Sequence, residues 1–247
     1  MINYLVDGLL LINQLFFNQL GITLIFIGVA VRVVFYPIIK QQLSHSQKIR
    51  ELQPQMNALK KKYGDDKVKL AEAQNELFKE AGVNPLAGCL PLIVQLVIFS
   101  VLYNAISQVF SRGVPTNFLF FDLKEPDVHN LFGLPFGVPG ILAILASLTQ
   151  FILSKMMLPE PVGIKANDDP KEKAEKADFM QDFAEMQSSM IWMFPLVFLF
   201  MASKFPSGLA LYWTSSTIMA IFQQWQFAGP GSLAPWLKKI GISPKSK

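Results

Sequence analysis

The chain contains 247 residues, of which 51% are hydrophobic and only 16% are charged. With a mean hydropathy of +0.35, this composition favours an integral membrane protein over a soluble enzyme. The single cysteine, Cys89, excludes an intramolecular disulfide, and two distant histidines, His45 and His129, offer no metal-ligand cluster. We therefore expect no metal or other cofactor. The net charge of +4 lies mainly in the connections between apolar runs, so we expect no sequence-specific binding to nucleic acid.

Residues 1–19 are expected to form an interfacial amphipathic helix. Asn3, Asp7, Gln14 and Asn18 fall within about 80° of one another on a helical wheel. Apolar residues occupy the rest of the wheel, so such a helix would lie on the outer membrane surface. The alternative is a hydrophobic extension of the first membrane-spanning segment.

Five apolar segments are expected to cross a bilayer as helices, because about 20 residues at ~1.5 Å each span the ~30 Å hydrocarbon core. The fourth has a short apolar part, so it must recruit flanking residues or tilt less than its neighbours. Together the segments predict an all-α, polytopic membrane protein. They are residues 20–39, 85–107, 138–158, 187–203 and 207–227.

The distribution of Lys and Arg predicts the orientation, because cytoplasmic connections carry the excess of positive charge. Residues 40–84 contain nine, 159–186 contain four and 228–247 contain four, whereas 1–19 contain none and 108–137 contain two. We therefore expect the N-terminus and the 108–137 loop outside, and the other two loops and the basic C-terminal tail in the cytoplasm. A bacterial inner membrane is favoured over an organelle because no transit peptide precedes the first helix.

Residues 40–84 are expected to form a cytoplasmic helical hairpin. Two apolar stripes with helical spacing lie on either side of a turn at residues 63–66. Pro54 either begins the first hairpin helix or kinks one that continues from the membrane. The basic run beside the turn is either a solvated, positive face or a contact for the ribosome or lipid headgroups. The tip comprises Lys60, Lys61, Lys62, Tyr63, Gly64, Asp65 and Asp66.

Arg32 lies inside the first apolar segment, where a charge near the bilayer centre costs at least about 2.5 kcal/mol. A guanidinium cannot escape this cost by losing its proton. Arg32 is seven residues before Ile39, or about 10 Å from the cytoplasmic end, so simple snorkelling is one explanation. The other is that Arg32 faces water, a partner or a cavity.

Polar residues also occur in other expected spans, namely Gln95, Gln150, Tyr212 and Trp213. Each has an ordinary explanation, as an interhelical hydrogen bond or an interface aromatic. No Asp or Glu lies in any of the five spans, so Arg32 has no internal counter-ion there. A shared hydrated concavity that opens to the cytoplasm explains these polar groups and the cation together. Such a site suits a negatively charged visitor.

Several motifs in one order resemble the YidC-type membrane protein insertases, a family with relatives in mitochondria and chloroplasts. Where the family frequently has Ser-Asn, this chain has Ser216 and Thr217. The matching motifs are residues 31–37 (VRVVFYP), 52–54 (LQP), 63–67 (YGDDK), 83–95 (VNPLAGCLPLIVQ), 205–213 (FPSGLALYW) and 223–224 (QQ).

The resemblance implies a five-helix core without an aqueous through-channel. It would hold a hydrophilic groove that opens to the cytoplasm and laterally to lipid. By position, Arg32, Gln95, Gln150, Tyr212 and Trp213 would line or flank this groove. The implied function is insertion and folding of newly made membrane proteins, with Arg32 attracting the acidic segment that is translocated.

The implied partners are nascent membrane proteins and the phospholipid bilayer, with the Sec translocon and the ribosome as further candidates. No nucleophile, phosphate-binding loop or metal cluster is evident, so we expect no enzymatic reaction. The alternative function is a small-solute channel or transporter, with Arg32 as an anion site. A second alternative is a structural scaffold in which Arg32 only snorkels.

Overall fold

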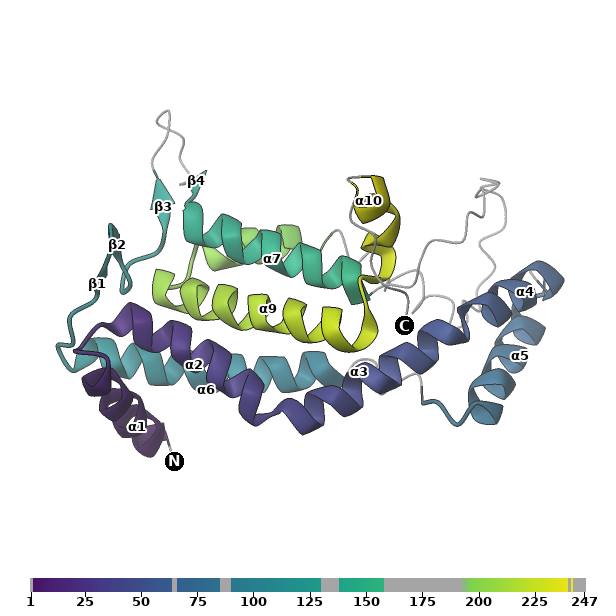
Figure 1. The fold of residues 1–247 in the computed structure, drawn as a ribbon, viewed down its shortest axis with the longest axis horizontal. Coiled ribbons are helices and arrows are strands. Elements are labelled where there is room, and N and C mark those ends of the chain that lie inside the picture. Colours follow the sequence, from purple (N-terminus) through teal and green to yellow (C-terminus); the bar gives the residue numbers. More distant parts are fainter. Residues whose placement is uncertain are drawn as a thin grey trace.

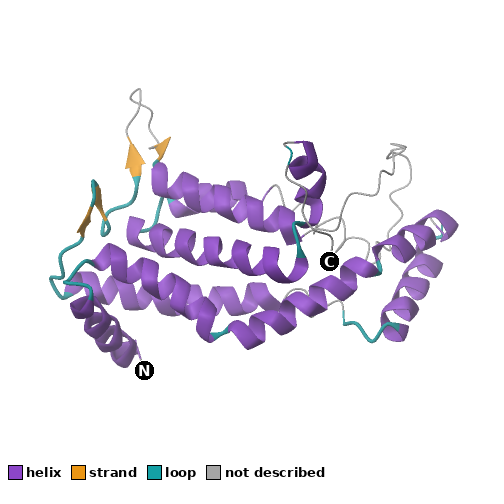
Figure 2. Ribbon diagram, viewed as in Figure 1, coloured by secondary structure: helices purple, strands orange, loops and turns teal. Residues whose placement is uncertain are grey.

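The computed structural model describes residues 2–63, 66–84, 90–129, 138–157, 193, 195–239 and 241. The described chain is mostly helical, with four short strands near one end (Figures 1 and 2). Helices α2 (Leu20–Val34), α6 (Leu90–Ser111) and α7 (Ile141–Met157) all pack around α9 (Ser207–Ala228) or contact it. The structure is therefore a helical bundle arranged about α9.

Helix α1 (Ile2–Leu15) meets α2 at an angle of 116°. The turn between them places Phe17 and Asn18 at φ values of 55° and 59°. Helix α1 packs against α6, and it buries Asn13, whose Oδ1 accepts a hydrogen bond from Thr23 Oγ1 at 2.9 Å. Its buried side is therefore partly polar. That α1 lies on the outer membrane surface stays a prediction.

The segment expected as one span over residues 20–39 is two helices in the structure. Helix α2 ends at Val34, and α3 (Tyr36–Glu51) begins after Phe35. The break has a backbone cause, because Pro37 has no N–H with which to continue the α2 hydrogen bonds. Helix α3 therefore extends well beyond the expected membrane boundary.

The region expected as a hairpin contains α4 (Gln53–Tyr63) and α5 (Lys67–Glu80), which pack against each other. Pro54 is the second residue of α4, where its missing N–H costs no helical hydrogen bond. Only Leu52, itself in a helical conformation, separates α3 from α4, so both roles of Pro54 stay predictions.

The region between α6 and α7 contains two small antiparallel sheets. Strand β1 (Asn117–Phe118) pairs with β2 (Phe121–Asp122), and β3 (Val128–His129) pairs with β4 (Val138–Pro139). The span expected from residue 138 therefore starts as a helix only at Ile141, because Val138 and Pro139 are used in strand pairing.

The C-terminal part of the described chain is helical. Residues 195–202 form a helix, which covers only part of the span expected at 187–203 because residues 187–192 and 194 lie outside the described residues. Helix α9 follows, and then come the short helices η2 (Gly231–Leu233) and α10 (Ala234–Lys239).

Length and composition identify fewer membrane crossings than the five expected. Among the described helices, α6 is long and apolar enough to cross a bilayer, through Val94–Ser111. Helices α1 and α2 would add a second crossing only if the bent pair is one span, and α7 is shorter. The number of crossings stays a prediction.

The segment 122–127 caps the first turn of α9. The carbonyl of Asp122 accepts a hydrogen bond from Ser207 Oγ at 2.8 Å, and the carbonyl of Leu123 accepts one from the Gly208 N–H at 2.9 Å. The N–H groups at a helix start have no partner inside the helix. This segment therefore supplies hydrogen-bond acceptors for the first turn of α9.

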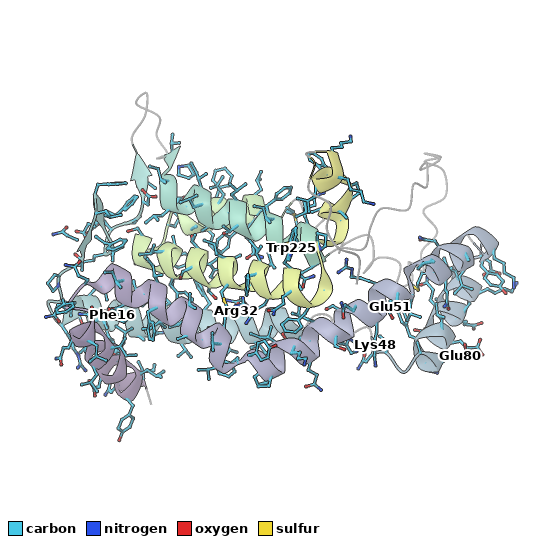
Figure 3. The ribbon with its side chains drawn as sticks, in the orientation of Figure 1. Phe16, Arg32, Lys48, Glu51, Glu80 and Trp225 are labelled. Atoms are coloured by element: carbon cyan, nitrogen blue, oxygen red, sulfur yellow. The ribbon has the colours of Figure 1, made fainter. Side chains whose placement is uncertain are left out.

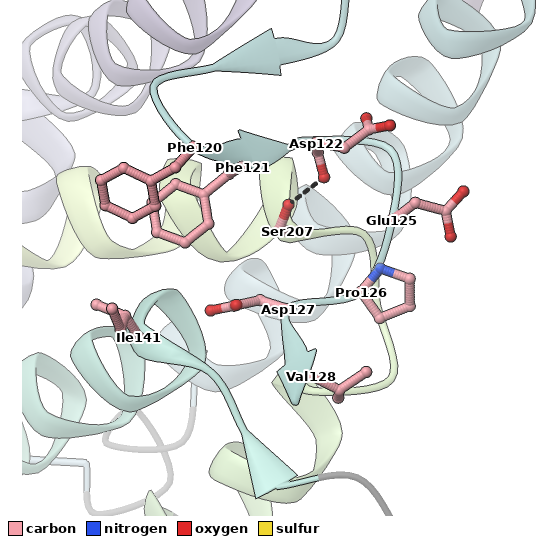
Figure 4. A pocket seen from close by; sticks show the side chains of 9 residues that line it. All are labelled: Phe120, Phe121, Asp122, Glu125, Pro126, Asp127, Val128, Ile141 and Ser207. Atoms are coloured by element: carbon pink, nitrogen blue, oxygen red, sulfur yellow. Dashed lines mark hydrogen bonds between the residues drawn. The ribbon is translucent and has the colours of Figure 1, made fainter. Parts of the chain in front are cut away.

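The same segment caps α7 through Asp127, which is buried. Its carboxylate accepts a hydrogen bond from the Leu142 N–H at 2.6 Å. A Cβ atom at Gly140 would overlap this carboxylate, so the glycine makes room for it. Figure 4 shows Asp127 among the residues that line a pocket of about 200 Å³ between this segment and the starts of α7 and α9.

We expect Asp127→Ala to lower the thermal stability of the purified protein, because the Leu142 N–H loses its acceptor. Loss of a helix cap typically costs about 1 kcal/mol. Asp127→Asn should cost less, since its side-chain carbonyl can still accept the bond. Thermal unfolding in detergent measures both, with Glu125→Ala as the control at an exposed position of the same segment. Equal losses for the two Asp127 variants would show that the negative charge matters rather than the cap.

Candidate functional site

Arg32 lies in the last turn of α2 and contacts α9 through two hydrogen bonds. Its Nε donates to Ser216 Oγ at 3.1 Å, and its backbone carbonyl accepts from Gln223 Nε2 at 3.1 Å. In Figure 3, Arg32 lies between Phe16 at one end of the bundle and Lys48 in α3. Within the described part of the chain, no Asp or Glu forms an ion pair with Arg32. The guanidinium is therefore held by a neutral hydroxyl.

The close approach of α2 and α9 depends on Gly28, one turn before Arg32. A Cβ atom at Gly28 would overlap Ser215 Oγ and would lie 2.9 Å from the carbonyl oxygen of Tyr212. Real Cβ atoms do not come so close to backbone atoms. Glycine at this position therefore brings Arg32 within hydrogen-bonding distance of Ser216.

Two hydroxyls of α9 have partners on their own helix. Ser215 Oγ donates to the carbonyl of Tyr212 at 2.8 Å, and Thr214 Oγ1 donates to that of Ala210 at 2.8 Å. For these two residues the ordinary explanation, a bond to their own helix, is sufficient. Tyr212 is only 2% exposed, so it lies within the bundle near Arg32 rather than at an open surface.

Trp213 joins α9 to three other helices. Its Nε1 donates to Gln150 Oε1 of α7 at 3.2 Å. Its ring meets that of Phe99 of α6 edge-to-face, with 5.8 Å between the ring centroids, and lies 4.6 Å from that of Phe198. The indole is therefore hydrogen-bonded at its N–H and packed against two aromatic rings.

Gln95 is the expected site residue that the structure joins least to the others. It lies one helical turn before Phe99, so the two share a face of α6. It is partly exposed, and no hydrogen bond connects it with the other four expected residues. The structure thus brings together Arg32 with Tyr212, and Gln150 with Trp213, whereas Gln95 is linked to them only through its position on the same face of α6 as Phe99.

Gln223 and Gln224 form one of the motifs that resemble the insertase family, but they are not among the residues expected to line the groove. Both are 2% exposed. Gln224 Nε2 donates to the Met156 carbonyl of α7 at 3.3 Å, as Gln223 does to that of Arg32. The Oε1 atoms of both have no hydrogen-bond partner among the described residues. Two adjacent amides in an apolar run were the signal that could have identified them.

The expected tip of the hairpin is described in part. Lys62 Nζ lies 4.9 Å from the centre of the Tyr63 ring. Asp66 accepts a bond from the Lys69 N–H at 3.1 Å and pairs with Lys69 Nζ at 2.8 Å. The hydrogen bond with Lys69 lowers the pKa of Asp66. The side chains of Lys60 and Lys61, and all of Gly64 and Asp65, lie outside the described residues.

The contacts around Arg32 are suited to binding rather than to covalent chemistry. Nε of the guanidinium donates to a neutral hydroxyl, so this contact does not neutralise the positive charge of Arg32. The indole of Trp213, three residues before Ser216 on α9, packs against the rings of Phe99 and Phe198.

The chain is similar to known inner membrane proteins over most of its length. The family model of the 60Kd inner membrane protein matches residues 11–229. The membrane protein insertase YidC of Pelobacter propionicus is 36% identical over 208 residues, which cover 83% of this chain and 34% of that protein. YidC of Rhizobium meliloti is 34% identical over 218 residues, which cover 84% of this chain and 33% of that protein.

A solved structure agrees with these relatives. The crystal structure of an active YidC insertase with its first transmembrane domain resolved has a TM-score of 0.59 and 26% identity, and covers 91% of this chain and 45% of that one. The chain spans about a third of the length of the curated relatives it matches. The resemblance inferred from the sequence motifs is therefore confirmed. The chain belongs to the 60Kd inner membrane protein family, the family of the YidC membrane protein insertases.

Proposed function

We propose that this chain is a membrane protein insertase, which inserts newly made membrane proteins and helps them to fold. One observation carries the proposal. Arg32 is fixed between α2 and α9 by the hydroxyl of Ser216, without a carboxylate partner among the described residues, in a chain whose relatives are named insertases. The missing counter-ion is then supplied by the arriving substrate.

The proposed site is a hydrophilic groove formed by Arg32, Gln95, Gln150, Tyr212 and Trp213. A substrate helix brings one short hydrophilic end that must cross an apolar layer. Polar walls replace part of the hydration of that end, and Arg32 attracts its acidic residues. The apolar part of the substrate meanwhile moves into lipid, and this burial drives insertion to completion.

The proposed partners follow from this mechanism. Nascent membrane proteins are the substrates, and the bilayer receives them. We place the N-terminus outside, the tail in the cytoplasm and five helices across the membrane. Helices α4 and α5 would then form the cytoplasmic hairpin, whose tip receives the substrate or meets the ribosome, and the Sec translocon is a further partner. The role involves no covalent reaction and no cofactor.

We expect Arg32→Ala to reduce the insertion of a single-span substrate whose translocated segment is acidic. Two charges about 4 Å apart gain about 4 kcal/mol at an effective dielectric constant of 20. Hydration of the groove will screen part of this, so we expect a loss of at least about tenfold, or ~1.4 kcal/mol. Insertion into vesicles that contain the purified protein measures the effect, as protease protection of the translocated segment.

The matched controls are Arg32→Lys and a substrate whose acidic residues are replaced by amides. Arg32→Lys should retain more activity than Arg32→Ala if positive charge is the requirement, whereas equal loss would indicate guanidinium geometry. The neutral substrate should respond little to either change. Normal insertion of the acidic substrate by Arg32→Ala would contradict the groove mechanism. If the vesicles instead conduct anions and Arg32→Ala abolishes this flux, the small-solute channel would be favoured. The names of the relatives, which are insertases, do not favour that alternative.

Gly28→Ala is expected to act through Arg32. The added methyl group overlaps Ser215 Oγ, so α2 and α9 must move apart and the bond between Arg32 and Ser216 lengthens. Insertion of the acidic substrate should fall severalfold, while the neutral substrate is inserted normally. Ser215→Ala in the same chain should restore part of the activity, because it removes the nearest obstructing atom.

Gly8→Ala is the matched control for Gly28→Ala, because a Cβ atom at Gly8 would meet no other atom within 4 Å. It should leave the insertion of both substrates unchanged. An equal loss with the acidic and the neutral substrate in Gly28→Ala would mean that the glycine serves only the packing of the bundle.

A further inference from the structure

The hairpin of β1 and β2 presents two apolar side chains at its tip. Asn117 pairs with Asp122 and Phe118 with Phe121, so Leu119 and Phe120 form a two-residue turn. Leu119 is 79% exposed and Phe120 is 77% exposed. The centroids of the Phe120 and Phe121 rings lie 4.4 Å apart. The most exposed part of the hairpin is thus its most apolar part.

These residues are unusual for such a turn. Two-residue hairpin turns favour Gly, Asn and Asp, because one or both central residues need a positive φ. Leu119 has a φ of 55°, a conformation that is unfavourable for a leucine. The turn therefore has an unfavourable residue at a position with positive φ and carries two large apolar side chains at the tip. A surrounding that accepts apolar side chains would offset this cost.

The hairpin lies at the end of the bundle where α2 begins. The Phe118 ring occupies the space beside Gly21, so that a Cβ atom on Gly21 would overlap it. Gly21 is the second residue of α2. The turn follows Phe118 directly, so its side chains reach about 7 Å from that point at the usual strand rise. The tip is thus near the level at which α2 starts.

A second apolar turn lies at the same end of α2. Phe17, between α1 and α2, is 90% exposed and also has a φ of 55°. Its neighbour Phe16 packs against Phe26 of α2, with 5.1 Å between ring centroids. Two separate turns near the start of α2 therefore expose large apolar side chains.

Charged residues surround the tip but do not enter it. Residues 113–121 contain no charged side chain. Arg112, just before them, pairs with Asp7 of α1 at 2.8 Å. In Figure 4 the carboxylates of Asp122 and Glu125 point away from the rings of Phe120 and Phe121, whereas that of Asp127 is turned toward their side. The charged groups therefore follow the turn in the chain and are not part of it.

We propose that Leu119 and Phe120 insert into the interfacial layer of the lipid bilayer at the end where α2 begins. This layer is about 5–7 Å thick on each side of the hydrocarbon core, which matches the reach of the turn, and aromatic side chains are enriched there. The partner is lipid, because the chain belongs to an inner membrane family and the tip extends from the start of an apolar helix. In the proposed orientation this is the outer leaflet. The inference does not depend on the role of Arg32.

The test places a fluorescent label at the tip of the full-length protein. In a Cys89→Ser background, Leu119→Cys and Phe120→Cys are each labelled with an environment-sensitive nitrobenzoxadiazole dye. Lys124→Cys, on the exposed charged part of the same segment, is the matched control. The proteins are reconstituted in vesicles of phosphatidylethanolamine and phosphatidylglycerol. Lipids with a doxyl quencher near the headgroup or near the chain end are then added in separate samples.

We expect both tip labels to emit at shorter wavelength than the Lys124 label. The shallow quencher should quench them severalfold more strongly than it quenches the control, and more strongly than the deep quencher does. Emission typical of water at both tip positions would overturn the proposal. A blue-shifted emission that lipid quenchers leave unchanged would also overturn it, because a protein surface would then cover the tip.

Discussion

The candidate site depends on the close contact between α2 and α9 at Gly28. Only a residue without a side chain lets the two backbones approach here. This approach brings the Arg32 guanidinium to Ser216 and the Arg32 carbonyl to Gln223. Helix α9 in turn reaches α7 through Trp213. A charge in an apolar helix is thus placed by backbone packing and not by an ion pair.

Helices α7 and α9 are joined at both ends, which fixes the spacing of the polar groups between them. At one end, the segment 122–127 caps the first turns of both helices. At the other end, Gln224 donates to the carbonyl of Met156, and Ser232 donates to that of Lys155. These bonds satisfy carbonyls that a helix end leaves free. The hydrogen bond between Trp213 and Gln150 lies between these two connections, so we expect α7 and α9 to move as one unit.

The sequence predicts those parts of the fold that depend on local chemistry. Helix α9 is expected over 207–227 and ends one residue later, because Pro206 and Gly229 bound a mainly apolar run that contains no other proline. The interruption near Pro37 was missed, since an apolar pattern continues through it. The partners of Arg32 could not be predicted, because Ser216 is 184 residues away in the chain and a serine in a helix usually bonds its own backbone. The sequence shows that burying Arg32 is costly, whereas the hydrogen bonds that hold Arg32 are evident only from the folded structure.

The nature of the Ser216 contact limits what the site can do. A carboxylate in that position would hold the guanidinium more strongly, but it would also cancel the charge and occupy the planar set of N–H donors. A hydroxyl orients Nε through one bond of 3.1 Å and leaves the positive charge in place. In the proposed mechanism this weaker contact suits a transient partner, because an acidic segment would bind and leave without displacing a resident counter-ion.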